Sequence, residues 1–253
     1  MSCDKTLKNS SPAPTSFKFQ NELDFAKEIA IQCGEIALKY YNACGGAAAK
    51  SGTKISSKAH AADLVTEGDQ AVEKFFTETV KSKFENKHKI LGEENTSAVS
   101  DGDTTSISDG PVNLKDLKDS IWVVDPIDGT MNFVHGFPHW CMSIGFIADG
   151  EIQLGVIYQP CTGDIYYAGK NLGSFKNGKK ISVSGAKELE GSLGTINFSL
   201  SRNKLIRKMV ELGTHGIRCT AACALQMCEL AEGSVDWYCH EGVHAWDYSY
   251  YCH

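Results

Sequence analysis

Asp125-Pro126-Ile127-Asp128-Gly129-Thr130 is the stretch that decides how the rest of this chain is interpreted. It follows residues 121–124, an apolar run whose β-branched and aromatic side chains are typical of a buried β-strand. Because proline has no N–H to donate to a neighbouring strand, the pattern predicts that this strand ends at Asp125. Two carboxylates are therefore expected at the mouth of a strand.

The same stretch combines the groups that phosphoryl chemistry uses. Oxygen atoms are the ligands that hard cations such as Mg²⁺ prefer, and Asp125 and Asp128 lie close enough in sequence to share them. Gly129 and Thr130 follow where a helix can begin, and free N–H groups at a helix N-terminus suit an anion such as phosphate. A metal beside a phosphate favours phosphoryl chemistry. The alternative interpretation is an Asx-rich turn after a strand.

The composition argues against some classes of function. The 253 residues suffice for one large domain or two closely packed halves. A net charge of −6 argues against nucleic acid or an anionic membrane as the main partner.

No apolar run approaches the roughly 20 residues that cross a bilayer. Residues 1–20 lack the apolar stretch of a signal peptide and are expected to form a disordered tail. The 10 cysteines include no CxxC pair, so reduced thiols and a cytoplasmic location are expected.

Periodicity predicts an α/β chain. Residues 21–43 keep a helical spacing of apolar side chains, and a second helix is predicted from Thr66, whose hydroxyl can cap it. After the strand at 89–91, an antiparallel meander is predicted from strands at 142–148, 152–158, 165–168 and 173–176. In the second half, strands at 194–198 and 216–219 alternate with helices at 204–212 and 221–232. Residues 95–120 are expected to form a long surface loop.

Five segments, in this order, carry a resemblance to a known family. They are Asp63-Leu64-Val65-Thr66-Glu67-Gly68-Asp69, Gly92-Glu93-Glu94, the stretch from Asp125 to Thr130, Asn132-Phe133-Val134-His135-Gly136-Phe137-Pro138, and Trp246-Asp247. Together they resemble the inositol monophosphatase family of Mg²⁺-dependent, lithium-sensitive sugar and inositol phosphatases, over residues 22–247. The resemblance implies a layered α/β/α/β/α sandwich that comprises residues 21–253.

The resemblance also implies roles for individual residues. The metal ligands would be Glu93, Asp125, the Ile127 carbonyl oxygen, Asp128 and Asp247, with Asp125 bridging two ions. The substrate contacts would be Asp125, Ile127, Asp128, Gly129, Thr130, Glu241 and Asp247. The catalytic residues would be Asp69, Thr130 and Glu93. Asp69 and Thr130 would orient and deprotonate the attacking water; the alternative for Asp69 is a partner for the helix dipole. Lys58 matches a family lysine on a mobile loop near the metal site, and the alternative is a solvated loop lysine.

Three departures from the family pattern are visible. The chain ends six residues after Asp247, so the last strands and helix of the fold are expected to be missing, as in a truncated chain. At the family's EMGIH-like run this chain has His240-Glu241-Gly242-Val243-His244. His240 without a gap, or Glu241 with a one-residue gap, matches the substrate-binding glutamate. Ala221-Ala222-Cys223 stands at the family's Gly-Ser/Thr-Ala turn.

Several other polar or aromatic residues are not assigned to the site. His135 and His139 are not predicted as metal ligands because Gly136 and Pro138 break the helical spacing between them. Cys219 and Cys223 are interpreted as buried small side chains. Three further residues are predicted to be structural, namely Trp122, Trp140 and Asp164.

The resulting prediction is a cytoplasmic homodimeric phosphatase that uses Mg²⁺ to hydrolyse inositol monophosphate, with water attacking the phosphorus directly. This activity belongs to inositol phosphate metabolism and phosphatidylinositol signalling. The predicted partner is the small phosphomonoester, with no nucleic acid and no membrane. The alternatives are another sugar or nucleotide phosphatase of the same fold, and a non-catalytic truncated isoform that acts through dimerisation.

Overall fold

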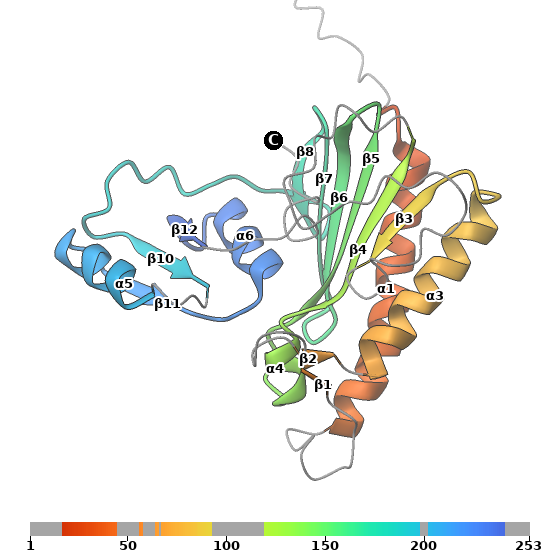
Figure 1. Cartoon of the computed structure of the whole chain (residues 1–253). Helices are drawn as coiled ribbons and strands as arrows, with labels where there is room; N and C mark the ends of the chain where they lie inside the picture. The colour runs from red at the N-terminus through yellow and green to blue at the C-terminus, as the bar shows by residue number, and fades with distance from the viewer. Residues whose placement is uncertain are drawn as a thin grey trace, which may run out of the picture.

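The computed structural model describes residues 17–44, 56–57, 64–65, 67–92, 119–197 and 202–240. In Figure 1, two long helices cover one face of a large sheet, and the later part of the chain forms a small sheet on the opposite side. The layers run helix, sheet, helix, sheet, helix, which confirms the predicted α/β/α/β/α sandwich. No helix in these ranges is both long and apolar enough to cross a membrane.

The large sheet has seven strands in the order β3-β4-β5-β6-β7-β8-β9. Their bounds are Lys89–Gly92, Ile121–Asp128, Cys141–Ala148, Glu151–Gln159, Asp164–Gly169, Gly173–Lys176 and Lys179–Lys180. β3 and β4 run parallel, and every later pair is antiparallel. The predicted meander is therefore confirmed, while the short edge strand β9 was not predicted.

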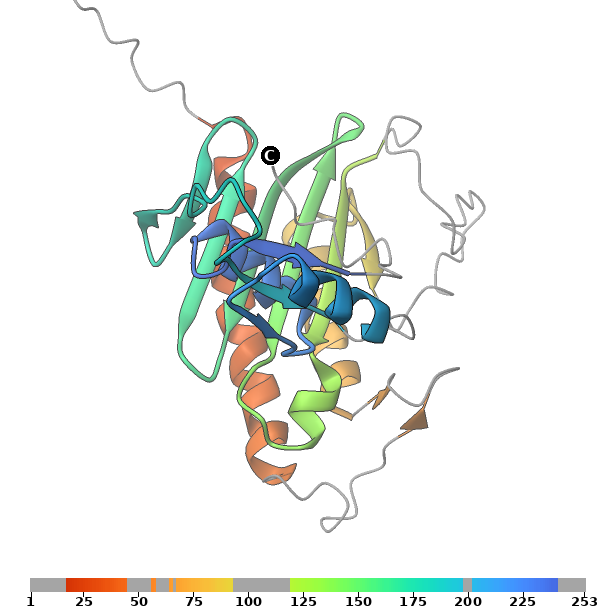
Figure 2. The same ribbon diagram turned by 90° about the vertical axis from the view of Figure 1, so that its left-hand side faces the viewer.

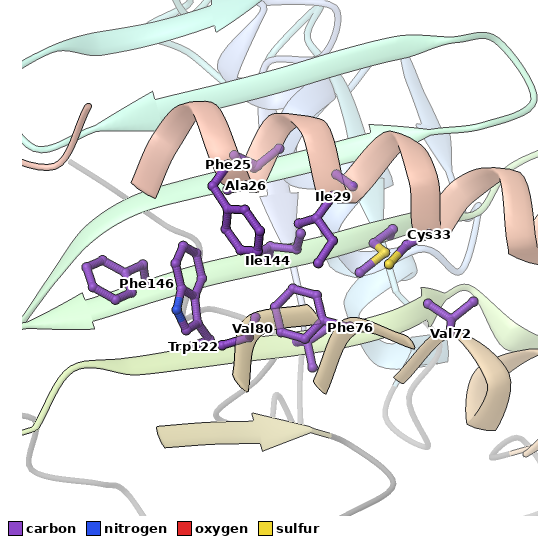
Figure 3. Close-up of a cluster of buried hydrophobic side chains, with 14 of the residues drawn as sticks. Phe25, Ala26, Ile29, Cys33, Val72, Phe76, Val80, Trp122, Ile144 and Phe146 are labelled. Carbon is purple, nitrogen blue, oxygen red and sulfur yellow. The ribbon is translucent and has the colours of Figure 1, made fainter. Parts of the chain in front are cut away.

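Two helices bury their apolar faces against this sheet. α1 (Gln20–Cys44) packs on α3 (Glu67–Lys83) and on β5 and β6, and α3 packs on β4. The buried positions of α3 recur at helical spacing and include Val72, Phe76 and Val80. Figure 3 shows these side chains meeting those of α1 and of the strands in one continuous core.

Trp122 of β4 is the centre of this core and is fully buried. Its ring centroid lies 4.5 Å from that of Phe146 and 5.6 Å from that of Phe25 (Figure 3). Its indole Nε1–H donates a hydrogen bond of 3.0 Å to His88 Nδ1, so this nitrogen of His88 must be unprotonated. Burial lowers the pKa of His88, and the charge of Glu22 opposes that shift. The prediction that Trp122 is structural is confirmed.

We expect the free energy of unfolding to depend on the protonation of His88. Because the folded-state pKa lies below the ordinary value of 6.5, the unfolded state binds the proton first as the pH falls. The contribution of His88 is therefore present above pH 6.5 and is lost as the pH falls through the lower, folded-state pKa. The variant His88→Asn keeps an acceptor for the indole but does not titrate. Thermal melting from about pH 7 to about pH 5 should show a weaker pH dependence in this variant than in the parent; equal pH dependence would contradict the assignment.

The second sheet is small and parallel, in the order β11-β10-β12. Its strands are β10 (Leu193–Ile196), β11 (Gly216–Arg218) and β12 (Trp237–Cys239). α6 (Cys223–Ala231) lies between the two sheets and contacts β5, β6 and β12. α5 (Arg202–Glu211) lies on the outer side of the small sheet, as Figures 1 and 2 show. A Cβ on Gly194 would overlap the ring of Trp237, so only glycine allows this indole to lie flat on β10.

The structure corrects four local predictions. β4 does not end at Asp125 but continues through Pro126 to Asp128. Its register with β5 shifts between Asp125 and Asp128, and β3 pairs only with residues 121–124, so the missing proline N–H leaves no ladder bond unmade. The last predicted helix begins at Cys223 rather than at residue 221, and Cys219 is exposed rather than buried. The strand β12 was not predicted.

Candidate active site

The predicted stretch forms a tight turn at the end of β4. The N–H of Ile127 donates to Asp125 Oδ1 at 3.2 Å, and the hydroxyl of Thr130 donates to the Ile127 carbonyl at 3.0 Å. Asp125 is 5% exposed, so its carboxylate lies in a largely dehydrated position. These bonds hold a carboxylate, a carbonyl and a hydroxyl together at one end of the large sheet.

Gly129 allows the chain to leave β4 and enter a short helix, α4 (Thr130–Val134). Its φ of +91° lies in the region that favours glycine. A Cβ at this position would lie 3.1 Å from the Ala222 Cβ and 3.1 Å from the His139 carbonyl oxygen. The glycine therefore serves two purposes, since it makes the turn and lets the loop before α6 approach closely.

Asp128 joins the two halves of the molecule. Its Oδ1 accepts the N–H of Cys223 at 3.0 Å, and its Oδ2 accepts the N–H of Ala224 at 2.7 Å. These are the first amides of α6, which have no partner within the helix, and a negative charge there is favoured by the helix dipole. The cap of α6 thus comes from a residue nearly a hundred positions earlier, because Ala222 supplies no side-chain cap.

The carboxylates also affect two buried thiols. Cys141 Sγ lies 3.6 Å from Asp128 Oδ2. Burial, and then the charge of Asp128, raises the pKa of the Cys141 thiol well above its ordinary value. Burial, and then the charges of Glu232 and Asp128, raises the pKa of Cys228 in the same direction. Both thiols therefore stay protonated, which avoids placing a further negative charge beside Asp128.

Two acids on α3 lie in the core rather than in solvent. Asp69, the predicted catalytic residue, is 3% exposed, and Glu73, one helical turn later, is 1% exposed. A Cβ on Gly92 would overlap the carboxylate of Glu73, which places that carboxylate against the last residue of β3. Glu73 was missed in the sequence. The available signal was its position in the apolar stripe of α3, where a charged side chain is unusual.

A second polar group surrounds the start of α6. Cys223 Sγ lies 3.1 Å from the Tyr238 hydroxyl and 3.5 Å from His240 Nδ1, and the Tyr238 hydroxyl lies 2.9 Å from the same nitrogen. Cys223 is buried, as predicted, because it opens a helix between the two sheets. His240 is one of the two residues that match the family's substrate-binding glutamate. It lies beside Cys223, whose backbone N–H donates to Asp128.

The structure brings together the predicted residues Asp125, Ile127, Asp128, Gly129 and Thr130, and it buries Asp69 on α3. Several other predicted residues lie outside the described ranges, namely Lys58, Thr66, Glu93, Glu241 and Asp247. Within the described ranges no three side chains of His, Cys, Asp or Glu gather in a way that would hold a metal by themselves. His139 contacts Glu229 at 2.9 Å, which supports a structural role for this histidine.

A cavity of about 250 Å³ lies elsewhere, between α6 and strands β6 to β8. Its walls are mainly apolar and include Ile157, Tyr166, Phe175 and Met227. It contains no carboxylate of the β4 turn. The oxygen donors suited to a metal and a phosphate lie at the end of β4, outside this cavity.

Comparison with known proteins identifies the family. The model of the inositol monophosphatase family matches residues 19–249. The chain belongs to the inositol monophosphatase family. It is 36% identical to inositol monophosphatase 1 of Bos taurus over 238 residues, which cover 90% of this chain and 78% of the relative. It is 33% identical to inositol monophosphatase 2 of Homo sapiens over 234 residues, covering 88% of this chain and 73% of the relative. Family membership identifies the chain as a phosphatase, a phosphoric monoester hydrolase.

Solved structures support the same fold. An inositol monophosphatase of Thermotoga maritima superposes with a TM-score of 0.73 at 26% identity, covering 90% of this chain and 79% of that one. An inositol monophosphatase of Anabaena superposes with a TM-score of 0.67 at 27% identity, covering 92% of this chain and 78% of that one.

Proposed function

We propose that this protein hydrolyses inositol monophosphate to inositol and phosphate, with Mg²⁺ as cofactor. The observation that carries the proposal is the turn at the end of β4. It places two dehydrated carboxylates, Asp125 and Asp128, beside the Ile127 carbonyl and the start of α4. Family membership supplies the reaction class, and these residues supply the groups that the reaction requires.

The donor atoms of the turn fit Mg²⁺. They are carboxylate and carbonyl oxygens, which hard divalent cations prefer to sulfur. The proposed ligands are Glu93, Asp125, the Ile127 carbonyl oxygen, Asp128 and Asp247. When bound, Mg²⁺ would neutralise phosphate charge and lower the pKa of water. Without cations, the buried carboxylates would repel an anionic substrate.

The phosphate is proposed to bind against the residues that open α4. The N–H groups of Gly129 and Thr130 follow the turn, and the positive φ of Gly129 turns the chain away from the strand at this point. Ala222 and the His139 carbonyl fill the side on which a Cβ of Gly129 would lie, so Gly129 is proposed to meet the phosphate through its backbone N–H only. Substrate contacts are therefore proposed from Asp125, the Ile127 carbonyl, Gly129 and Thr130.

The attacking water is proposed to be oriented by Asp69, Thr130 and Glu93. The hydroxyl hydrogen of Thr130 points to the Ile127 carbonyl, so its oxygen is oriented to accept a hydrogen bond from water. Asp69 is a buried carboxylate on α3 and is proposed to accept the proton of that water. Water attacks phosphorus as the P–O bond to the inositol oxygen breaks. The proton of the attacking water goes to Asp69, and the leaving alkoxide takes a proton from solvent water to depart as the alcohol.

The inositol ring of the substrate is proposed to lie on the side of the turn that faces α6. Asp128, Glu241 and Asp247 are the proposed contacts to its hydroxyl groups. His240 and Tyr238 lie beside Cys223 on that side. The leaving group is therefore proposed to lie near an imidazole and a phenol as well as near carboxylates. We further propose that the enzyme acts as a homodimer in the cytoplasm and serves phosphatidylinositol signalling.

The proposal predicts Mg²⁺-dependent phosphate release from myo-inositol 1-phosphate and inhibition of that release by Li⁺. Li⁺ would occupy a cation position with too little charge to support turnover. Phosphate release should be measured with and without Mg²⁺, and then with LiCl against an equal concentration of NaCl as the control for ionic strength.

The choice of substrate distinguishes the proposal from its nearest alternative. A sugar bisphosphate and a nucleoside bisphosphate should be hydrolysed more slowly than inositol 1-phosphate. Faster hydrolysis of either one, or Li⁺-insensitive turnover, would assign the chain to another branch of the same fold. No Mg²⁺-dependent release from any of the three would favour the non-catalytic alternative.

A further inference from the structure

Two contacts join the β4 turn to the segment before α6. One is the capping of α6 by Asp128, described above. The other comes from Asn132 in α4, whose side-chain amide Nδ2 donates to the His139 carbonyl at 2.6 Å and to the Thr220 carbonyl at 2.6 Å. The first acceptor precedes β5 and the second precedes α6, so one side chain connects three segments that meet at the turn.

The segment that Asn132 holds has an unfavourable backbone conformation. Ala221, next to Thr220, has a φ of +55°, a left-handed conformation that is unfavourable for alanine because its Cβ crowds the following carbonyl oxygen. Ala222 then returns to an extended conformation before α6 begins. This path brings Ala222 against Gly129 and points the amides of Cys223 and Ala224 at Asp128. The hydrogen bond from Asn132 to the Thr220 carbonyl therefore stabilises the backbone next to the unfavourable conformation of Ala221.

Other contacts of α6 do not replace this one. His139 Nε2 meets Glu229 Oε1 at 2.9 Å, and Lys176 Nζ meets Glu232 Oε2 at 2.8 Å. Both glutamates lie in the last part of α6 or just after it, away from the end that caps onto Asp128. They fix the far end of the helix against the large sheet. Nearer its start, Gln226 Nε2 donates to Thr195 Oγ1 at 2.5 Å and to the Ile196 carbonyl at 2.9 Å, and Cys223 Sγ contacts the Tyr238 hydroxyl, so these contacts tie α6 to the small sheet. Asn132 instead ties the segment before α6, at Thr220, to α4.

We propose that Asn132 is a positioning residue that sets the start of α6, and the leaving-group side of the site, against the β4 turn. This inference rests on the proposed function for its kinetic part only. The β4 turn, with Asp125 and Thr130, faces the phosphate, whereas α6 and β12 form the side proposed for the sugar. Loss of Asn132 is therefore expected to weaken recognition of the inositol ring more than binding and hydrolysis of the phosphate.

The first test measures hydrogen exchange of the Cys223 and Ala224 amides in the full chain. Asn132→Ala removes both hydrogen bonds, and Asn132→Asp keeps the size but replaces the donor by an acceptor. Both variants should exchange these two amides about tenfold faster than the parent, the effect of losing a hydrogen bond at the turn. Unchanged exchange in both variants would overturn the proposal. This measurement needs no activity, so it remains informative if the proposed function is wrong.

The second test compares two substrates. In Asn132→Ala, kcat/KM should fall about tenfold for myo-inositol 1-phosphate. It should fall less for p-nitrophenyl phosphate, whose leaving group has no ring hydroxyls to recognise. Equal losses on both substrates would indicate a merely structural role and overturn the proposal. If Asn132→Ala does not fold, Asn132→Ser retains one donor and is subjected to the same two tests.

Gln153→Ala is the matched control. Gln153 is 6% exposed, and its side-chain amide in β6 donates to the carbonyl of Ala148, the last residue of β5, at 2.7 Å. Its loss also removes a buried amide donor, but one that bonds to β5 and not to the segments joined by Asn132. The control should leave the exchange of Cys223 and Ala224, and the ratio of kcat/KM between the two substrates, unchanged. A control that reproduces the effect of Asn132→Ala would contradict the proposed mechanism.

Discussion

Asp125→Asn should abolish Mg²⁺-dependent hydrolysis while the chain remains folded. Asp125 is a proposed Mg²⁺ ligand, and replacing its carboxylate would remove a negative charge from the set of residues that would hold the metal. We expect a loss of at least about 10²-fold in turnover, since even a misplacement near 1 Å has an effect of that size. Without cations the substitution relieves repulsion between buried carboxylates, so thermal melting in EDTA should be equal to that of the parent or higher.

The control for Asp125→Asn is the same Asp-to-Asn substitution at a position outside the proposed site. Asp149→Asn neutralises an exposed aspartate that pairs with Lys18 on the surface, and it should retain parental activity. Turnover of Asp125→Asn within tenfold of the parent would show that the cation assignment is wrong. Melting with and without Mg²⁺ adds a direct readout, because the stabilisation by Mg²⁺ seen in the parent should be lost in Asp125→Asn.

Asp128→Asn should reduce both activity and stability. In the parent, both carboxylate oxygens accept amides of α6, at 3.0 and 2.7 Å. An asparagine offers one oxygen and turns its own N–H₂ group towards the second amide. Loss of a capping interaction of this kind costs about 1–2 kcal/mol in the free energy of unfolding. We therefore expect a lower melting temperature in addition to a loss of turnover of at least about 10²-fold.

The two aspartate variants test the site as a pair. Both should lack Mg²⁺-dependent turnover, but only Asp128→Asn should melt at a lower temperature in EDTA. If Asp128→Asn melted like the parent, the contact between the β4 turn and α6 would contribute nothing to stability. If Asp125→Asn were also destabilised, Asp125 would have a structural role that its hydrogen bond with the Ile127 amide does not explain.

Much of the fold could be predicted from the sequence because its signals are local. The apolar spacing of residues 21–43 predicts α1, and the run before Asp125 predicts the start of β4. The end of β4 could not be predicted from Pro126 alone. Whether a missing N–H matters depends on whether a neighbouring strand needs it, and pairing of β3 with residues 121–124 is a long-range property. The β12 strand was missed for a related reason, since three residues carry too little periodicity.

The sequence predicted which residues of the β4 turn form the site, but not the hydrogen bonds that join this turn to α6. The grouping of Asp125, Ile127, Asp128, Gly129 and Thr130 follows from their adjacency in the chain. The link from Asp128 to α6, and that from Asn132 to Thr220, join segments about 90 positions apart and leave no local pattern. Glu73 differs, because its place in the apolar stripe of α3 was a local signal, and only its contact with Gly92 of β3 depends on the tertiary structure.

The capping of α6 by Asp128 also sets the order in which the site is completed. The large sheet needs only residues up to β9, so it emerges from the ribosome as a connected unit, and domains generally fold as the chain is made. The amides of Cys223 and Ala224 follow roughly a hundred residues after Asp128, and closing so large a loop is slow. Until then the carboxylate of Asp128 is without its two amide donors. A nascent chain thus carries the β4 turn early, and the site is completed only when α6 arrives, together with the rest of the fold.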